Sequence, residues 1–253
     1  MSTHLNRIGI AFTCVAATLM LPASARALPI FAGVGAAVAP ATATEPPSDI
    51  VFRDDFESRK SGWEVAEVQG WTSAYEAGRY LIRAHEGASN HYTFGSIAMK
   101  RAANVRIDMD VSLMGNYGAA LVQCYDSNPY DQPGGSGEVI AVARELPHIY
   151  VGMNEAAYSM YVSLDGVRTQ LGSARIPSEK AWLAGPNRMT VICTGEPGQP
   201  GRVQLLLNGN TIADVAVATM PPLGFTVPGF EAFRGAPYDT GAAIDNLVIR
   251  RVG

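Results

Sequence analysis

Three features that would point to a familiar chemistry are scarce in this sequence: cysteine, histidine and clusters of basic residues. Three of the 253 residues are cysteine and four are histidine. No histidine or third cysteine stands at the spacing of zinc ligands, and Gly134–Gly137 lacks the strand–turn–helix context of a nucleophile elbow. These absences argue against a zinc site and against a serine hydrolase.

Basic residues are too few for a strongly anionic partner. The chain carries 19 Lys and Arg against 23 Asp and Glu, a formal net charge of −4. Removal of residues 1–27, expected from the signal described next, takes away Arg7 and Arg26 and no acidic residue. The 17 basic residues that remain against 23 acidic ones give a net charge of −6. Nucleic acid and anionic lipid both require clustered Lys and Arg, so we exclude them as partners.

Long apolar runs are also absent, since none reaches the ~20 residues of a membrane-spanning helix. The N-terminus instead has the layout of a secretory signal, with Arg7, the apolar stretch Ile8–Leu21 and a small-x-small motif at residues 25–27. We therefore expect a secreted or extracytoplasmic protein whose mature chain is not inserted in a membrane. The organisation expected is a signal peptide over 1–27 (alternatively cleaved after 43), an Ala/Pro/Thr-rich tether over 28–49 and one domain over 50–253.

Helical periodicity is nearly missing, and the only helical candidate is Ser178–Leu183. Apolar and polar residues alternate instead, and Asn208-Gly209 and Asp165-Gly166 stand between alternating segments as hairpin signals. The strands expected are Ile50–Phe56, Arg79–Ala84, Tyr92–Ala98, Asn104–Leu113, Ala119–Tyr125, Val139–Ala143, His148–Met153, Ser159–Leu164, Val167–Leu171, Arg188–Thr194, Gly201–Asn208, Thr211–Val217, Phe225–Phe233 and Ala243–Arg250. Many short strands with turns between them predict an all-β antiparallel sandwich or barrel.

Two cysteines remain after the expected cleavage, Cys124 and Cys193. Each alternates with apolar residues, so both point inward if their segments are strands. An even number of cysteines in an exported chain favours a disulfide. The sequence therefore predicts a Cys124–Cys193 bridge, with two separate buried thiols as the alternative.

Motifs at both ends of the domain and in two hairpins carry a family resemblance. They are Asp54-Asp55-Phe56-Glu57-Ser58 with Gly62-Trp63, Tyr75-Glu76-Ala77-Gly78-Arg79-Tyr80, Val203-Gln204-Leu205-Leu206-Leu207-Asn208-Gly209 and Ala243-Ile244-Asp245-Asn246-Leu247-Val248-Ile249. This set resembles the opening and closing strands and the hairpins of jelly rolls in the concanavalin A-like lectin/glucanase superfamily. The resemblance implies a single-domain jelly-roll β-sandwich over about residues 50–251.

For function, the resemblance implies a secreted, non-catalytic binding module, with carbohydrate as the first expectation. A structural or protein-interaction domain of the cell envelope and a sugar-active hydrolase or lyase remain as alternatives. Glycoside hydrolases of the superfamily carry Glu-x-Asp-x-x-Glu on one strand, whereas Asp108-Met109-Asp110 has no glutamate following at that spacing. We therefore assign no catalytic residue and expect both aspartates on a solvated outer face.

Candidate ligand-binding residues are polar or aromatic side chains on loops or on the outward phase of strands. They are Tyr117, Gln123, Tyr125, Tyr130 and Asn154. An ordinary polar outer face is the alternative for those on strands. Most of the other large aromatic residues, the tryptophans among them, are expected in the core or at sheet edges.

The resemblance also implies a structural calcium where the first and last strands of the domain meet. Glu57 and Asp245 occupy the positions of the acidic ligands, and Asp55 is a possible third. Calcium prefers roughly six to eight oxygen ligands, so backbone carbonyls and water would have to complete the site. The alternative is that Asp245-Asn246 only starts a surface strand while Asp54-Asp55 face solvent.

Overall fold

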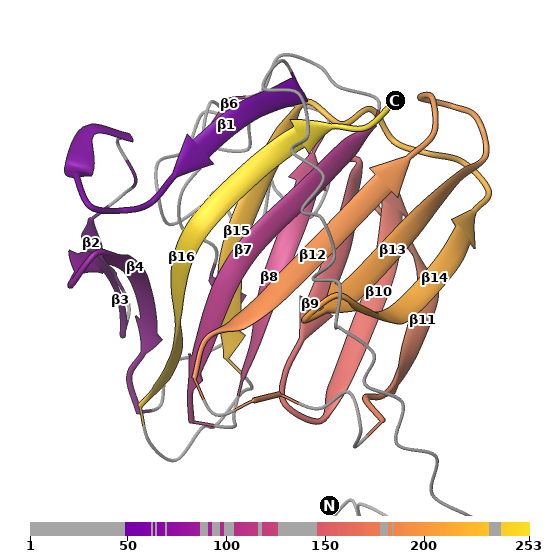
Figure 1. The fold of residues 1–253 in the computed structure, drawn as a ribbon. Helices are drawn as coiled ribbons and strands as arrows, with labels where there is room; N and C mark the ends of the chain where they lie inside the picture. The colour runs from indigo at the N-terminus through magenta and orange to yellow at the C-terminus, as the bar shows by residue number, and fades with distance from the viewer. Residues whose placement is uncertain are drawn as a thin grey trace, which may run out of the picture. The chain divides into compact units, whose positions relative to one another are not determined.

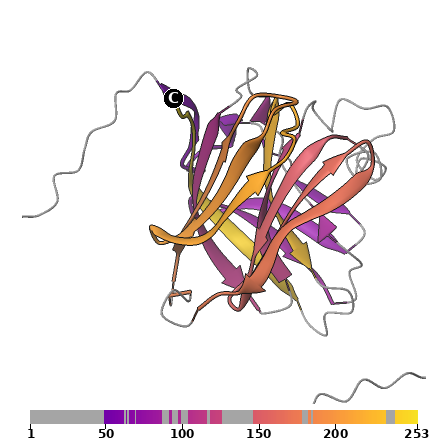
Figure 2. The ribbon, with the colours of Figure 1, turned by 90° about the vertical axis from the view of Figure 1, so that its right-hand side faces the viewer.

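The computed structural model describes residues 49–61, 63, 65–68, 70–86, 91–92, 97–98, 104–115, 118–125, 146–177, 182–183, 185–232 and 239–253. All of them belong to one unit, Glu45–Gly253. Apart from 3-10 positions at Asp49 and Arg59–Ser61, their regular structure consists of β-strands in two antiparallel sheets that pack face to face (Figures 1 and 2). The predicted all-β antiparallel jelly-roll sandwich is confirmed.

The first sheet has nine strands in the order β14-β13-β12-β7-β16-β4-β3-β2, with β1 paired to β16. Its strands are β1 (Ile50–Asp54), β2 (Ala66–Val68), β3 (Trp71–Glu76), β4 (Arg79–Ala84), β7 (Val105–Met114), β12 (Asn187–Thr194), β13 (Gly201–Leu207), β14 (Asn210–Val217) and β16 (Thr240–Arg251). The first and last strands of the domain thus lie side by side, as the motifs at its two ends suggested.

The second sheet has seven strands in the order β11-β10-β9-β8-β15-β5, with β6 paired to β15. Its strands are β5 (His91–Tyr92), β6 (Ile97–Ala98), β8 (Gly118–Tyr125), β9 (His148–Met153), β10 (Ala157–Leu164), β11 (Val167–Arg175) and β15 (Phe225–Ala232). In Figure 2 the two sheets are seen as two layers.

Two hairpin turns have the backbone that their sequence demands. Asn208-Gly209 has φ angles of 51° and 81°, and Asp165-Gly166 has 51° and 73°. Positive φ at both central residues is the mark of a type I′ turn, which matches the twist of the flanking strands. The third such turn, Ala77-Gly78, joins β3 to β4 and confirms the hairpin expected from the family motif.

The core lies between the sheets and follows the alternation along each strand. On β7, for example, Val105, Ile107 and Met109 are fully buried. Cys124 on β8 and Cys193 on β12 are also buried, and a hydrogen bond joins the two thiols across the core. That contact and burial raise the pKa of Cys193 well above its ordinary value. No disulfide joins Cys124 and Cys193 in this structure, so the bridge stays a prediction.

An aromatic cluster anchors the opening motif of the domain. Phe56 stacks on Tyr80 at 5.8 Å between ring centroids, and Trp63 meets Tyr80 at 5.1 Å. Asp54 is buried beneath them, where it accepts hydrogen bonds from the Phe56 N–H at 2.8 Å and from Trp63 Nε1 at 2.7 Å. The alternative that Asp54 faces solvent is therefore wrong, because its carboxylate fixes the turn after β1.

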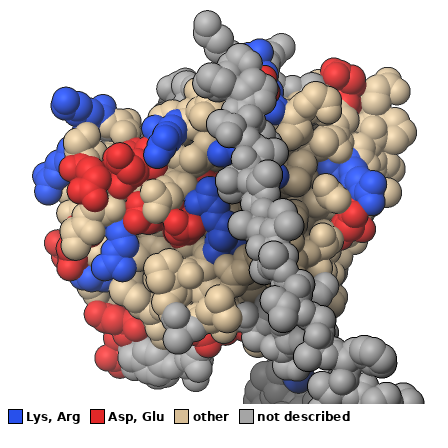
Figure 3. Space-filling model, viewed as in Figure 1, with Lys and Arg blue, Asp and Glu red and all other residues tan. Residues whose placement is uncertain are grey.

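On the outer face of the nine-stranded sheet, Asp108 and Asp110 are not solvated, contrary to the expectation from the sequence. Asp108 is only 2% exposed, and it accepts hydrogen bonds from Arg106 at 2.9 and 3.1 Å and from Thr190 Oγ1 at 2.6 Å. Asp110 is half-buried, and its Oδ1 accepts a hydrogen bond from Arg188 Nη1 at 2.9 Å. The aspartates do lie on the outer face, but they are paired with basic side chains instead of being solvated. Figure 3 shows acidic and basic side chains side by side over this sheet.

Some expected and observed elements do not correspond to one another. The expected strand Val139–Ala143 and most of the expected helix Ser178–Leu183 lie outside the described residues. Conversely, β2 was not predicted from the sequence, and of β3 only its end at Tyr75-Glu76 was expected, as the first arm of the hairpin in the family motif. Within the described part of the chain, no helix is long and apolar enough to cross a membrane.

Candidate functional site

The outer face of the seven-stranded sheet, here called the tyrosine face, differs in kind from the outer face of its partner sheet. Alternation along the strands and their register place one set of side chains on it. Its members are Ala119, Leu121 and Gln123 on β8, His148, Tyr150 and Gly152 on β9, Ser159, Tyr161 and Ser163 on β10, and Glu231 on β15.

A row of stacked groups crosses this face. Tyr150 and Tyr161, direct partners on β9 and β10, lie parallel with ring centroids 4.4 Å apart and planes 6° apart. The guanidinium of Arg168 lies 4.8 Å from the centroid of Tyr161 as a cation–π contact, and His148 meets the same ring edge-on at 5.7 Å. The stack holds both tyrosine rings in fixed orientations.

At one end of the tyrosine face is a pocket of about 180 Å³, here called the face pocket. Polar groups from four strands and one turn converge on it. They are Tyr150 on β9, Asn154 in the β9–β10 turn, Ser159 on β10, Ser173 on β11 and Glu231 on β15. The face pocket therefore offers hydroxyl, amide and carboxylate groups around one hollow.

The centre of the face pocket is a hydrogen bond from the Tyr150 hydroxyl to the Glu231 carboxylate. Burial raises the pKa of Tyr150 well above its ordinary value, and the adjacent negative charge of Glu231 raises it further. Tyr150 thus stays a neutral phenol at ordinary pH.

Gly152 makes room for this arrangement. A Cβ at Gly152 would lie 2.4 Å from the Tyr150 hydroxyl oxygen and 2.8 Å from its ring. No side chain fits there while the tyrosine keeps its position, so the glycine is needed for the geometry of the pocket.

Buried polar atoms on the tyrosine face lack partners. Gln123 is 4% exposed and Ser163 is fully buried. Among the described residues, neither Gln123 Oε1 nor Ser163 Oγ has a hydrogen-bond partner. Such an atom costs stability compared with an apolar replacement. Unpaired polar atoms gathered on one face are a feature of sites built to bind, because a binding site keeps polar groups that folding alone would not favour.

The predicted binding residues are only partly brought together. Asn154 lines the face pocket, although its Oδ1 accepts hydrogen bonds from the N–H groups of Ala156 and Ala157 and so shapes the turn. Gln123 lies on the tyrosine face but is buried. The backbone of Tyr125 continues β8 beside it. The side chain of Tyr125, together with Tyr117 and Tyr130, lies outside what the structure describes.

Sequence reasoning missed Tyr150, Ser159, Ser173 and Glu231. The alternation along β9 was a signal for one member of this set. Tyr150 lies on the same side of the strand as His148, Gly152 and Asn154, opposite to Met153. Glu231 carried no local signal, because only the pairing of β8 with both β9 and β15 brings it to Tyr150.

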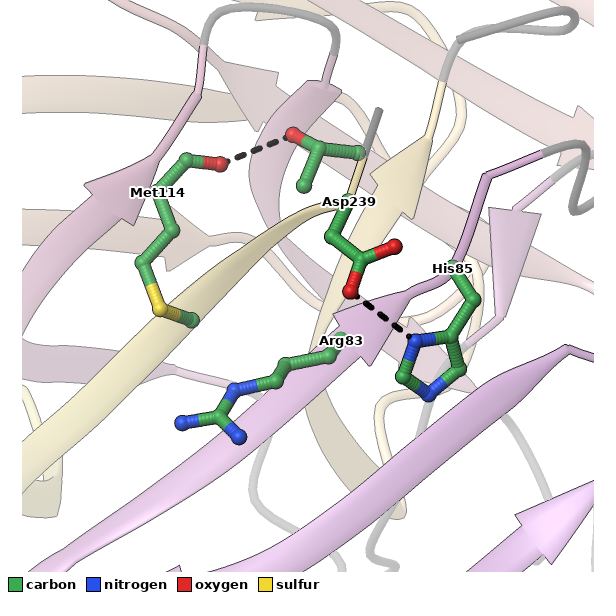
Figure 4. Close-up of a pocket in the computed structure, with 5 residues that line it drawn as sticks. Arg83, His85, Met114 and Asp239 are labelled. Carbon is green, nitrogen blue, oxygen red and sulfur yellow. Dashed lines mark hydrogen bonds and ion pairs between the residues drawn. The ribbon is translucent and has the colours of Figure 1, made fainter. Parts of the chain in front are cut away.

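A second pocket, of about 310 Å³, lies where β4 and β7 end and β16 begins, and is here called the end pocket. Figure 4 shows His85 turned toward Asp239, with Nδ1 and Oδ2 3.1 Å apart, while Arg83 and Met114 line the other side. Asp239 also accepts the Glu86 N–H at 3.0 Å. The hydrogen bond with His85 lowers the pKa of Asp239. Arg83 pairs with Glu76 at 3.0 Å, so its guanidinium has a partner of opposite charge.

The expected calcium ligands do not form a cluster in the described residues. Nowhere in that part of the chain do three or more His, Cys, Asp or Glu side chains converge as metal ligands would. Asp55 accepts the Glu57 N–H at 3.2 Å, and Asp245 accepts the Asn246 N–H at 2.6 Å. Each carboxylate thus shapes its own turn, and a calcium there would rely on backbone carbonyls and water. The calcium site stays a prediction.

No protein-family model and no curated protein sequence matches the chain. Similar solved structures include a protein of unknown function with a galectin-like fold from Bacillus subtilis, with TM-score 0.56, 13% identity, and coverage of 80% of this chain and 96% of that one. The carbohydrate recognition domain of Emp47p has TM-score 0.54 at 12% identity, covering 82% and 99%. An endo-β-1,4-glucuronan lyase from the fungus Trichoderma reesei has TM-score 0.54 at 11% identity, covering 80% and 96%. The described domain therefore has a lectin-like β-sandwich fold.

Proposed function

We propose that this protein is a secreted carbohydrate-binding module of the concanavalin A-like superfamily that holds sugar in the face pocket. The observation that carries the proposal is the pocket itself. Tyr150, Ser159, Ser173 and Glu231 bring donors and acceptors to one hollow on a rigid sheet. Sugars present many hydroxyl groups, each a donor and an acceptor, so a hollow of this composition is complementary to them.

The fold supports this assignment at the level of architecture. Solved structures with a similar sandwich include a carbohydrate recognition domain and a polysaccharide lyase. The N-terminal signal pattern at residues 1–27 would bring the domain outside the cytoplasm, where polysaccharides are found.

A lyase is the second candidate, because one similar structure is a glucuronan lyase. Elimination from a uronic acid requires a base that removes the proton next to the carboxylate. A tyrosine serves as such a base once it is deprotonated, which a lowered pKa favours. The raised pKa of Tyr150 therefore argues against this phenol as the base.

An interaction domain for an envelope protein is the third candidate. The obvious docking surface would be the charged outer face of the nine-stranded sheet. Its acidic groups Asp108, Asp110 and Asp214, however, already pair with arginines of the same sheet. This leaves less charge for a partner and favours the sugar hypothesis.

The test is a polysaccharide pull-down and glycan array with the mature chain, run beside an assay for unsaturated products. Two variants locate the site. Gly152→Ala would place a Cβ 2.4 Å from the Tyr150 hydroxyl oxygen. The Cβ of Gly172→Ala would lie 3.5 Å from its nearest neighbours, which is an ordinary van der Waals distance. We expect wild type and Gly172→Ala to bind, and Gly152→Ala to lose binding. A wild-type chain that retains no polysaccharide contradicts the proposal, and product release would favour the lyase instead.

A further inference from the structure

The face pocket is small for a ligand site. Its volume is about 180 Å³, whereas pockets that enclose a whole small ligand typically hold about 300–1,000 Å³. The hollow therefore has room for about one sugar unit and not for a longer stretch of a sugar chain. Any further unit of a bound chain would lie on the surface beside the pocket, so the residues next to the pocket determine whether that unit is held.

One wall of the face pocket is the β9–β10 turn, which is held from two sides. Asn154 and Ala157 line the pocket, and the Asn154 N–H donates to the Ala157 carbonyl at 2.9 Å. On one side Ile176, the residue after β11, donates its N–H to the Ala156 carbonyl at 2.8 Å. On the other side the indole Nε1 of Trp182 donates to the Asn154 carbonyl. Trp182 thus brings the loop before β12 against a residue that lines the pocket.

The next residue of that loop, Leu183, carries an exposed side chain on a fixed backbone. Leu183 is 63% exposed, whereas Asn187, which holds it, is only 1% exposed. Asn187 Oδ1 accepts the Leu183 N–H at 2.8 Å, and Asn187 Nδ2 donates to the Leu183 carbonyl at 3.1 Å. The same Nδ2 donates to the Gly185 carbonyl at 2.9 Å. One buried amide therefore supplies the hydrogen bonds that a neighbouring strand would supply in a sheet.

An exposed apolar side chain is by itself ordinary. Val167, for example, is 67% exposed at the turn end of the β10–β11 hairpin, where it pairs with Leu164. Leu183 differs from it because its loop is bonded to the wall of the face pocket through Trp182. A contact residue whose backbone is already ordered loses less conformational entropy when a ligand binds.

From this arrangement we propose that the ligand of the face pocket is a chain of two or more sugar units, and that Leu183 packs against the unit next to the one in the pocket. The inference rests on the proposed function and names its ligand class, an oligosaccharide or polysaccharide instead of a free monosaccharide. Sugar rings carry C–H groups beside their hydroxyl groups, and burial of C–H groups against an apolar side chain is favourable. Trp182 is a positioning residue, because its hydrogen bond to Asn154 sets where the loop meets the pocket.

The experiment measures affinity against chain length. The polysaccharide that binds best in the pull-down is cut into mono-, di-, tri- and tetrasaccharides. The affinity of the mature protein for each is measured by competition against the parent polysaccharide. We expect the di- or trisaccharide to bind at least about tenfold more tightly than the monosaccharide, a factor that the burial of one leucine side chain can supply.

Two serine variants at exposed positions assign this gain to a residue. Leu183→Ser removes the proposed contact, and Val167→Ser makes a similar change at the other end of the β10–β11 hairpin. We expect Leu183→Ser to keep the wild-type affinity for the monosaccharide and to lose most of the gain with chain length. Val167→Ser is expected to keep both. Thermal unfolding of the two variants checks that each remains folded.

A third variant tests the positioning role of Trp182. Trp182→Phe keeps an aromatic ring and removes the N–H that donates to Asn154. We expect the gain with chain length to shrink while the monosaccharide affinity stays the same. An equal loss at every chain length would overturn the positioning role and make Trp182 a support of the pocket itself. If Trp182→Phe does not fold, Leu183→Ser decides the inference on its own.

The outcomes separate this inference from the proposed function. If no polysaccharide or oligosaccharide binds, the proposed function fails. If the monosaccharide binds as tightly as the longer chains, the function stands and the inference is overturned. If affinity rises with chain length but Leu183→Ser keeps the whole rise, the assignment to Leu183 is overturned.

Discussion

The outer faces of the two sheets satisfy their polar groups in opposite ways. On the nine-stranded sheet, Asp108 and Asp110 each accept hydrogen bonds from an arginine of the same sheet. On the tyrosine face, Tyr150 stacks on Tyr161, while Gln123 Oε1 and Ser163 Oγ are buried with no hydrogen-bond partner in the described part of the chain. One face is arranged for stability, and the other keeps polar atoms that reduce it.

This difference indicates which face carries a function. Buried polar atoms without partners cost free energy, and apolar replacements of similar size would remove that cost. Natural proteins depart from such local rules mainly at functional sites. Gln123 and Ser163 both lie on the tyrosine face, outside the lining of the face pocket, while the charged face is the more conspicuous in Figure 3.

The largest effect on the free energy of unfolding is expected from the two cysteines that meet between the sheets. Cys124 and Cys193 lie on opposite sheets with their thiols in contact. Exchange with a disulfide oxidant, such as oxidised glutathione, would join their sulfurs and leave two reduced thiols on the oxidant. Closing a loop of roughly 70 residues stabilises by about 4 kcal/mol in the chain-entropy model. Denaturant unfolding with and without reductant measures this difference in the free energy of unfolding.

Matched controls accompany that measurement. Cys193→Ala removes one of the two sulfurs, so the free energy of unfolding of this variant is expected to be the same with and without reductant. Thiol titration of the denatured, unreduced, exported protein is expected to find no free thiol. Two free thiols in that sample would end the prediction and leave both cysteines as core residues.

A pair of hydroxyl deletions tests the comparison of faces directly. Thr190 on the charged face donates to Asp108 at 2.6 Å, whereas the buried Ser163 hydroxyl on the tyrosine face has no partner among the described residues. We expect Thr190→Val to lower the free energy of unfolding by about 1.5 kcal/mol and Ser163→Ala to raise it by up to about 1 kcal/mol. Urea unfolding of both variants measures the sign of each change in the free energy of unfolding. Equal losses of stability in the two variants would refute the comparison of the faces.

The same comparison shows which parts of the molecule could be predicted from the sequence. Strand alternation and turn residues are local signals, so the predicted bounds of β4 and β9 agree with the structure at both ends. By contrast, β2 was missed because it is only three residues long. Of β3, only the end in the hairpin motif was expected, because its middle is Thr-Ser-Ala, with no large apolar residue.

The candidate site was less predictable than the fold. Tyr150 and Glu231 are 81 residues apart in the sequence, and they meet only because β8 pairs with both of their strands. The burial of Asp108 also depended on the register of β7 and β12, which places Thr190 opposite it. Contacts of this kind arise from sheet order, which no local pattern encodes.

A third prediction uses the phenol at the centre of the tyrosine face. Burial and Glu231 raise the folded-state pKa of Tyr150 above its unfolded value. The hydrogen bond to Glu231 therefore contributes its full stability below about pH 10 and loses it as the pH rises further. We expect Tyr150→Phe to cost about 1 kcal/mol at pH 8 and to flatten the loss of stability above pH 10. Thermal unfolding of both proteins between pH 8 and 11 measures this, and parallel curves would contradict it.

The smallest effect is expected in the end pocket, which belongs to neither face. The pKa of Asp239 is lowered by its hydrogen bond to His85, so this pair contributes stability above the unfolded pKa of Asp239 and loses it as the pH falls through the folded value. The Asp239 side chain is 63% exposed, however, and solvent and salt screen an exposed pair. We expect Asp239→Asn to shift the unfolding midpoint by much less than Thr190→Val at pH 6, and the shift to shrink further in high salt. A loss as large as that of Thr190→Val would mean that the end pocket, like the charged face, is held together by its ion pairs.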